Sequence, residues 1–407
     1  MLNPDQVRRW RAGVASNPEL RRAFDGHHLG EVELDIPREP VARDGKRIAI
    51  GSFYPPAAII GEPFDRACMD GIGTFPIHAL PIASGTYRDA RVVGASALLT
   101  AEGVLLAPGD VRHWGRAQFV GHRSIGHQGF LVEDSGERVV LRFVARPTPR
   151  VLAMDALFLH NLEPGNFGSF MFRQLPQMLA ARATERSFDC YITADRVPWF
   201  LEALALLGFP PRPVFTVREV TGEIFRSVTL YDGFDVEGFL RPETRRSLAD
   251  LTGKLPPARG RARRKIYVSR LLSGLARPWY RAMQNEHEVE QRMQRRGFEI
   301  IHPETLSLKA QARVFSTASH VVGPSGSGMF NVMFAHETLR VVDIETFHVT
   351  VRQHAKLYAS LGAEYAFLFA PMDSEDMRAP EHRKWTLPLD LLDQALDWAL
   401  SGDTAAD

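Results

Sequence analysis

The chain has 407 residues, of which 45% are hydrophobic and 24% are charged, and these are the proportions of an ordinary globular protein. They exclude a disordered, collagen-like or coiled-coil chain, and the length predicts two or three domains. The 49 lysines and arginines balance the 48 aspartates and glutamates, so the net charge offers no general attraction to nucleic acid.

Two features bear on the compartment. The cysteines, Cys68 and Cys190, are too few for a disulfide framework or a four-thiolate metal site, and they fit a reducing compartment. The N-terminal segment lacks the apolar core of a signal peptide, and no stretch approaches the ~20 apolar residues that span a bilayer. We therefore expect a soluble, cytoplasmic protein.

Residues 1–150 are expected to form a short helix followed by a β-rich domain. Val7, Trp10, Val14 and Leu20 recur roughly on one side of an N-terminal helix. From about residue 30 onward, short apolar runs alternate with turns that contain glycine, aspartate and proline, which is typical of strands. The clearest runs are Ile48–Ile50, Val92–Leu99, Val104–Leu106 and Val139–Val144.

Residues 151–250 show helical and strand patterns in alternation. Phe170–Ala181 is predicted as a helix, Cys190–Thr193 as a strand, and Pro198–Leu207 as a helix that ends at Gly208. Such alternation is typical of an α/β layer, and we expect it to form the second domain.

A basic stretch, residues 241–265, follows. It holds nine basic residues against two acidic ones, together with Pro256-Pro257, and we interpret it as an interdomain linker. Its run 259–265 is either a solvated linker or a patch for anionic lipid or a phosphorylated substrate. The second reading predicts peripheral contact with the inner face of a membrane.

From Lys265 onward, strands alternate with helices. This order predicts a parallel sheet with a Rossmann-like core for a third domain, 251–407. The predicted strands are Lys265–Ser269, Phe298–Ile301, His320–Val322 and Leu339–Ile344, and the predicted helices are Asn285–Arg296, Leu308–Phe315 and Met329–Ala335.

The loop Gly323–Gly328 joins an apolar strand to a helix. Its free N–H groups and the helix start favour the binding of an anion, phosphate above all. The alternative is that the same residues form only a tight turn between the strand and the helix. Gly326 and Gly328 supply φ freedom and let a ligand approach the backbone, and Asn331 is placed to fix the ligand or the loop. Met329 and Phe330 occupy the positions where a P-loop needs lysine and serine or threonine, and a dinucleotide fingerprint would need glycine at 331. The pattern therefore disfavours a kinase or an NAD enzyme.

Arg270 follows the strand that begins at Lys265, on the side of an open α/β sheet where ligands bind. A guanidinium there can grip a phosphate in bidentate fashion, and a surface salt bridge is the alternative. Asn285 is a good N-cap for the next helix, and Glu286 complements its dipole.

The motifs between about Asp155 and Tyr365, taken in the order in which they follow along the chain, resemble those of the glycosyltransferase 61 family. Its pattern runs from a strand ending Tyr-[Ile/Val]-Ser-Arg, through Asn-Glu-x-Glu and Gly-Phe, to Gly-x-His-Gly-Ala-Gly-x-x-Asn and a strand ending in glutamate. The upstream segment Asn166–Pro176 is similar to the family's N-Y-x-H-W-x-x-[ED]-x-L-P. The matching downstream residues are Tyr267, Ser269, Arg270, Asn285, Glu286, Glu288, Gly297, Phe298, Gln311, Gly323, Gly326, Gly328, Asn331 and Glu345.

The resemblance, to a divergent member of the bacterial surface-polysaccharide type, implies a GT-B-like α/β fold with two Rossmann-like domains facing a cleft. It implies inverting transfer, without a required metal or other cofactor, from a nucleotide sugar (UDP-sugar) to a hydroxyl of a polysaccharide or glycolipid. The chain contains no Asp-x-Asp, the sequence with which metal-dependent transferases hold their ion. In this reading Arg270 and the loop Ser325, Gly326, Ser327 and Gly328 hold the diphosphate, supported by Glu286 and Asn331. Glu345 accepts hydrogen bonds from the ribose, and Asn166 and Ser269 complete the predicted substrate-binding set.

The chain departs from the family pattern where acceptor activation is expected. Ser169 stands in place of a histidine and Arg173 in place of an acid, and Ser325 replaces the loop histidine. Serine cannot serve as the general base that inversion needs. His160 and Asp195 are the candidates to replace it as the general base. The alternatives are that His160 is an ordinary packed histidine and that Asp195 is an acid at the start of a helix.

Two other function classes stay open. One is a catalytically degenerate partner subunit that binds a nucleotide sugar or glycan, and the other is a Rossmann oxidoreductase. Metal binding by histidines is disfavoured because they lack a matching cysteine or acidic set; these histidines are His27, His28, His122 and His127. No G-x-S-x-G surrounds Ser325 or Ser327, which disfavours a serine hydrolase.

Overall fold

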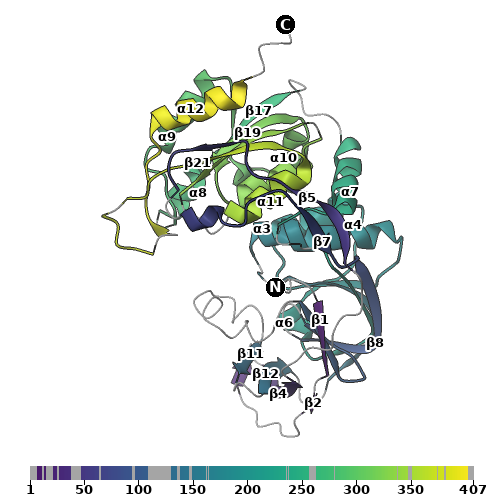
Figure 1. Ribbon diagram of the computed structural model, residues 1–407. Coiled ribbons are helices and arrows are strands. Elements are labelled where there is room, and N and C mark those ends of the chain that lie inside the picture. The colour runs from purple at the N-terminus through teal and green to yellow at the C-terminus, as the bar shows by residue number, and fades with distance from the viewer. Residues whose placement is uncertain are drawn as a thin grey trace. The chain divides into compact units, whose positions relative to one another are not determined.

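The computed structural model divides the chain into two compact units (Figure 1). The first unit comprises Met1–Ile48 and Ala79–Val236, and the second comprises Ala49–His78 and Glu237–Asp407. Each unit is thus built from two separate parts of the chain, whereas the domains predicted at 1–150, 151–250 and 251–407 are continuous; those boundaries stay predictions. The structure describes residues 7–11, 13–14, 22–24, 27–37, 47–63, 66–93, 97–108, 130–134, 138–145, 149–161, 163, 165–234, 236, 238–255, 263–278, 280–336, 338–346, 351–373, 375–379 and 382–401.

The first unit contains an eight-stranded sheet in the order β1-β10-β9-β8-β16-β13-β14-β15. One half is parallel and consists of β16 (Ile224–Asp232), β13 (Val151–Leu159), β14 (Cys190–Thr193) and β15 (Val214–Thr216). The other half is antiparallel and consists of β8 (Ala83–Val93), β9 (Ala97–Leu99), β10 (Val104–Pro108) and β1 (Val7–Arg11). The last four residues of β13 are buried and apolar, as expected of a parallel strand covered on both faces.

Helices connect the parallel strands of the first unit. Between β13 and β14 the chain forms α3 (Phe167–Ser169), the π-helix η2 (Phe170–Gln174) and α4 (Leu175–Ala183). The later connections hold α5 (Pro198–Leu206) and α6 (Val217–Val220). The predictions of a helix over Phe170–Ala181, a strand over Cys190–Thr193 and a helix from Pro198 are confirmed. The π-helical turn was not predicted.

The β-rich character of the N-terminal region is confirmed. A further antiparallel sheet of the first unit has the order β11-β12-β4-β2, with β3 also paired to β4. Its strands are β11 (Phe130–Asp134), β12 (Arg138–Ala145), β4 (His27–Pro37), β2 (Gly13–Val14) and β3 (Arg22–Phe24).

The predicted N-terminal helix is wrong. Val7–Arg11, with Trp10, forms the strand β1 and pairs antiparallel with β10, and Val14 lies in β2. An isolated short helix is marginal in water, whereas pairing with an available sheet edge satisfies the same backbone groups. Tertiary pairing therefore overrides the helical spacing of the apolar residues. Leu20, His122 and His127 lie outside the described residues.

The second unit is built on a six-stranded parallel sheet in the order β18-β17-β19-β20-β21-β6. Its strands are β18 (Glu299–Ile301), β17 (Arg264–Val268), β19 (Ala318–Pro324), β20 (Arg340–Glu345), β21 (Glu364–Phe369) and β6 (Ala58–Ile60). A small two-stranded sheet, β5 (Ile48–Phe53) with β7 (Phe75–Ala79), and the 3-10 turn η1 (Arg66–Met69) come from the N-terminal part. The predicted α/β class and parallel sheet are confirmed.

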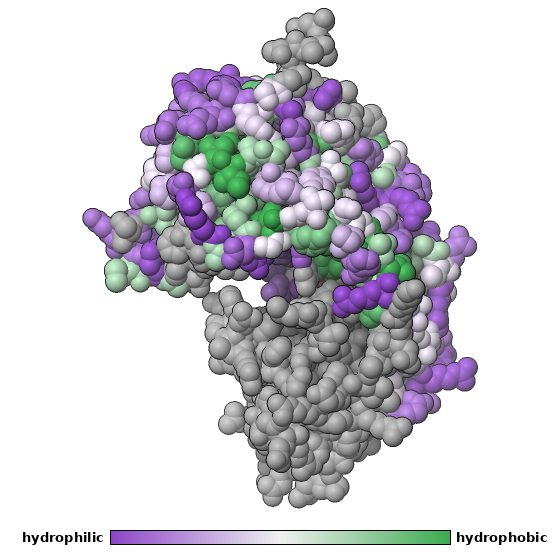
Figure 2. All heavy atoms as spheres, viewed as in Figure 1, coloured by the Kyte–Doolittle hydropathy of each residue, from purple (hydrophilic) through white to green (hydrophobic). Residues whose placement is uncertain are grey.

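Helices cover both faces of this sheet (Figure 1). On one face α9 (Glu286–Arg295) and α12 (Leu389–Leu400) pack on a buried cluster that includes Val289, Met293 and Leu396. The remaining helical elements are α7 (Pro242–Gly253), α8 (Leu271–Ala276), η3 (Pro303–Thr305), α10 (Leu308–Phe315), η4 (Ser327–Phe334) and α11 (Val351–Leu361). Figure 2 shows hydrophilic and hydrophobic residues interspersed over the visible face of this unit.

Two sequence predictions for the second unit need correction. Pro242–Gly253, within the predicted linker, is the helix α7, because its buried Leu248 gives one face something to pack; residues 256–262 of the basic stretch lie outside the described residues. The glycine-rich loop is shorter than predicted, since β19 continues to Pro324 and η4, a 3-10 helix rather than an α-helix, begins at Ser327.

Each parallel sheet contains a point at which the chain reverses its direction of strand addition. In the second unit, β18 is added on one side of β17, and β19 is then added on the other side. In the first unit, β14 and β15 extend from one side of β13, and β16 returns to its other side. Ligands of open α/β sheets bind outside the carboxyl ends of the strands at such a switch point.

The packing of α12 yields a first prediction. Leu396→Ala truncates a fully buried side chain and should lower the free energy of unfolding by about 2–5 kcal/mol, because apolar burial is lost and a cavity is left that the core fills only in part. Urea denaturation followed by circular dichroism measures the loss. Gln394→Ala, on the exposed side of the same helix, is the matched control, and an equal loss in both variants would contradict the assigned core.

Candidate functional site

The carboxyl ends of three neighbouring strands gather polar residues in the second unit. Tyr267 of β17 pairs with Val322 of β19, and Pro324 at the end of β19 pairs with Ile344 of β20. Continuing this register brings Arg270, Ser325 and Glu345 to one edge of the sheet. The switch point between β17 and β19 lies at the same edge.

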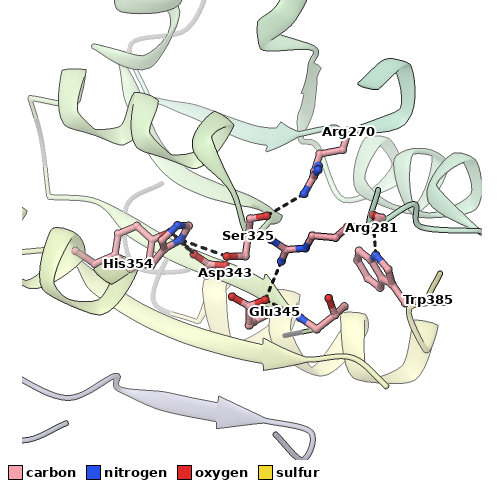
Figure 3. A network of polar contacts seen from close by, with 9 residues as sticks. Arg270, Arg281, Ser325, Asp343, Glu345, His354 and Trp385 are labelled. Carbon is pink, nitrogen blue, oxygen red and sulfur yellow. Dashed lines mark hydrogen bonds and ion pairs between the residues drawn. The ribbon is translucent and has the colours of Figure 1, made fainter. Parts of the chain in front are cut away.

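Arg270 is held across the switch point. Its Nη1 donates to the carbonyl oxygen of Ser325 at 3.1 Å (Figure 3), and its guanidinium carbon lies 5.8 Å from the centre of the Tyr280 ring. The pKa of Arg270 is lowered, first because surrounding protein removes water from the guanidinium and second because the positive Arg281 lies near it. The cation is therefore fixed in a poorly hydrated place, where an anion would interact with it strongly.

Glu286 lies beneath the backbone of Arg270. Its Oε1 accepts hydrogen bonds from the Arg270 backbone N–H and, at 3.2 Å, from the Ser269 hydroxyl, and Ser269 Oγ also lies 2.7 Å from Oε1 of Glu290. Burial raises the pKa of Glu286 to about 7, against the lowering effect of these bonds and of the Arg270 charge. Glu286 therefore supports the turn after β17 from beneath, and its carboxyl group titrates near neutrality.

The glycine turn is shaped by steric limits as well as by φ. Gly326 has φ +148°, and a Cβ there would lie 3.4 Å from Arg270 Nη1. At Gly323 a Cβ would come within 2.8 Å of the Val268 carbonyl oxygen, and at Gly328 within 3.2 Å of a Val268 methyl. Gly326 thus keeps the space beside Arg270 open, while the other two glycines let β19 and η4 approach β17.

Asn331 fixes the turn rather than standing free. Its side chain is fully buried, and its Nδ2 donates to the Gly328 carbonyl oxygen at 3.1 Å. Ser327 opens η4 and is partly buried. Sequence reasoning left open whether Asn331 holds a ligand or the loop, and the observed bond is to the loop.

A buried histidine that the sequence did not single out supports Ser325. His354, in α11, has Nδ1 in hydrogen-bond contact with Asp343 Oδ2 and 3.5 Å from Ser325 Oγ. Tyr358 donates its hydroxyl to the same Asp343 oxygen. Because serine and aspartate both approach one ring nitrogen, the group is no Ser-His-Asp relay, which requires the two partners on opposite nitrogens.

A second arginine lies at the edge and was also missed. Arg281 Nη2 donates to Glu345 Oε1 at 2.9 Å, and Glu345, which has no exposed surface, also accepts from the backbone N–H of Thr346 (Figure 3). The structure therefore places Glu345 with Arg281, and the role predicted for it toward a ribose stays a prediction.

The predicted residues of the first unit gather where β13 ends. Asn166 caps α3, with its Oδ1 accepting from the backbone N–H groups of Gly168 and Ser169. Arg173 Nη1 donates to Ser169 Oγ at 2.7 Å and lies 3.5 Å from Glu163 Oε2. Ser169 in turn donates to Asn161, which sequence reasoning did not single out.

His160 and Asp195 differ in their surroundings. His160 is buried, its Nε2 lies 3.0 Å from the Tyr231 carbonyl oxygen, and burial lowers the pKa of its imidazole to about 4. Asp195 follows β14 and is partly buried, and a Cβ at Gly165 would lie 4.0 Å from its Oδ2. The Asp195 carboxylate thus adjoins the Gly165–Asn166 turn, whereas the His160 ring points into packed protein.

Two features that the described residues lack bear on metals and membranes. Within the described ranges, no three His, Cys, Asp or Glu side chains lie together in a way that could hold a metal ion. No helix among the same residues has the length and apolar character needed to cross a bilayer.

Comparison with known protein families finds a match to this part of the chain. Residues 144–342 match the family model described as Glycosyltransferase 61. The matched range includes the ends of β13, β17 and β19 described above, and it supports this family and, with it, a glycosyltransferase. No curated protein matches the chain.

Titration of Glu286 gives the second prediction. Its pKa is about 7 in the folded protein against an ordinary 4.5, so between these values the folded state keeps a proton that the unfolded state has lost. Stability conferred by the protonated form is therefore lost as pH rises through this window. Glu286→Gln has no such proton to lose, so its free energy of unfolding should not fall over this window. Relative to the wild type, the variant should become more stable by up to about 3 kcal/mol as the pH rises from 4.5 to 8.

Urea unfolding at several pH values measures this difference. Glu288→Gln, on the exposed side of the same helix, should leave the pH dependence of the wild type unchanged. Parallel stability curves for Glu286→Gln and the wild type would refute the raised pKa.

Proposed function

We propose that the protein is an inverting glycosyltransferase that moves a sugar from a nucleotide diphosphate donor, with UDP as the carrier, to a hydroxyl of a surface polysaccharide or glycolipid. The observation that carries this proposal is the meeting of Arg270 and the Ser325–Gly326 turn at the switch point of the second unit. The family match over residues 144–342 supports it independently.

The donor end of the reaction needs positive charge and hydrogen-bond donors. As the sugar departs, negative charge develops on the diphosphate, and preorganised donors in a poorly hydrated site stabilise it most. Arg270 is such a cation, and Gly326 leaves room beside its Nη1 for a phosphate oxygen. In this proposal the cation and the turn neutralise the leaving group, so no metal is required.

The acceptor end needs a base, and within a GT-B-like fold we assign that base to the first unit. The cluster around Asn166, Ser169 and Arg173 lies at the carboxyl end of β13, next to the switch point of its own sheet. Of the two candidate bases, Asp195 fits better, because it is partly exposed and adjoins this cluster. The His160 imidazole, with its pKa lowered to about 4, is a weaker base than an ordinary histidine, and its burial makes it poorly accessible to an acceptor.

A catalytically degenerate binder is the second candidate function. The bonds from Arg173 to Ser169 and from Arg270 to Ser325 hold these positions without supplying a base. We expect turnover, measured as nucleoside diphosphate release from a panel of sugar nucleotides with polysaccharide and lipid-linked acceptors. Tight UDP binding without transfer or hydrolysis for any pair would instead establish the binder.

Asp195→Asn tests the assignment of the base. The variant should lower kcat by roughly 10²–10⁴-fold, the usual contribution of general base catalysis, while the KM for the donor stays near that of the wild type. His160→Gln serves as the comparison and should change kcat far less. The reverse order of the two effects would move the base to His160.

Arg270→Ala tests the donor site. Loss of a charged hydrogen-bond donor should weaken UDP binding by roughly 1.5–3 kcal/mol, measured by isothermal titration calorimetry. Lys309→Ala, an exposed cation on α10 of the same unit, controls for the general loss of one positive charge. Unchanged UDP affinity in a folded Arg270→Ala protein would rule out this donor site.

A further inference from the structure

We propose that Arg281 is a second diphosphate-binding residue, and that Glu345 is the positioning residue that aims it. This inference rests on the proposed donor site and extends it to a residue that neither the sequence motifs nor the family pattern quoted above singles out. The ligand class is a nucleoside diphosphate, gripped by two guanidinium groups at one sheet edge.

The side chain of Arg281 is largely buried, and one of its hydrogen-bond donors has no partner among the described residues. It is 10% exposed, and its Nη2 donates to Glu345 Oε1 at 2.9 Å. Its Nε is buried and has no hydrogen-bond partner among the described residues. A guanidinium carries five N–H donors in a planar fork, so a buried one with an unused donor has capacity for a further acceptor.

Glu345 is committed to this arginine. It has no exposed surface, and its Oε1 receives both Arg281 Nη2 and the backbone N–H of Thr346. A carboxylate so enclosed fixes the plane of the guanidinium that it binds. The contact therefore orients Arg281 at the end of β20, one strand away from Ser325.

The backbone of Arg281 is held in an unusual conformation. Its φ is +51°, a left-handed value that a residue with a side chain adopts only at an energetic cost. Trp385 maintains it, since its indole Nε1 donates to the Arg281 carbonyl oxygen at 3.0 Å and its backbone bonds to Ala282 and Gln284. Such strain persists where the surroundings enforce it, and it commonly serves a functional site.

Arg281 and Arg270 converge on the same place. Figure 3 shows both guanidinium groups directed toward Ser325, and the charge of Arg281 acts on Arg270 strongly enough to lower the pKa of Arg270. Two like charges near each other in poorly hydrated surroundings repel. An anion with at least two charges between them relieves that repulsion, and a diphosphate presents one phosphate to each fork.

The test compares three ligands, UDP, UMP and uridine, by isothermal titration calorimetry. Arg281→Gln should weaken UDP binding on the order of 10-fold or more, as loss of a charged hydrogen bond does. UMP should lose less affinity than UDP, and uridine should keep the wild-type affinity. A merely structural role would shift all three ligands alike. Arg295→Gln, an exposed arginine of α9 in the same unit, is the matched control and should bind UDP as the wild type does.

Two further variants address folding and the role of Glu345. Arg281→Lys keeps the charge but not the fork, so it should fold and weaken UDP binding to an intermediate degree. Glu345→Gln should weaken UDP but not uridine, and should add nothing in the Arg281→Gln background if it acts through Arg281.

The outcomes separate this inference from the proposed function. Wild-type protein that binds no nucleoside diphosphate would overturn both. If UDP binds and Arg270→Ala weakens it, while folded Arg281→Gln and Arg281→Lys keep UDP affinity within about twofold, an effect smaller than any charged contact gives, then only the role of Arg281 is overturned. An independent, additive effect of Glu345→Gln would refute its role as a positioning residue.

Discussion

The bond from Arg270 Nη1 to the carbonyl oxygen of Ser325 joins the ends of the two strands between which the chain changes direction. β18 and β19 are added on opposite sides of β17, and ligands of open α/β sheets bind at such a point, outside the carboxyl ends of the strands. The glycines of the turn make this approach possible, since a Cβ at Gly323 would collide with the carbonyl oxygen of Val268. Everything proposed for the donor depends on this contact.

The elements that local interactions form could be predicted from the sequence, whereas those that depend on contacts between remote residues could not. Leu308–Phe315, Cys190–Thr193 and the strand after Lys265 were predicted because local patterns specify them. Val7–Arg11 was mistaken for a helix because its partner, β10, is remote in sequence. Two residues of the site were not predicted for the same reason, since their partners are also remote in sequence. Arg281 meets Glu345 across 64 residues and His354 meets Ser325 across 29, and no local motif marks either one.

Water exclusion sets the electrostatics of the edge in the second unit. Burial raises the pKa of Glu286 to about 7 and lowers that of Arg270, so the acid tends to lose its charge while the guanidinium remains ionised at any ordinary pH. Glu345 forms an ion pair with Arg281 and so balances its positive charge. The acids of this edge therefore orient the cations without presenting a free carboxylate to a phosphate.

The proposed function divides the work of the transferase between two sheets, for a chemical reason. A leaving diphosphate needs cations, whereas a hydroxyl acceptor needs a base, and a base beside Arg270 and Arg281 would pair with them, as Glu345 does. A carboxylate that pairs with an arginine has a lowered pKa and is therefore a weaker base. The first unit has its own switch point, where Asp195 lies near Gly165 and Asn166, and where Arg173 is bound to Ser169 and Glu163. In the proposed function, the base therefore belongs to a different sheet from the one that carries Arg270 and Arg281.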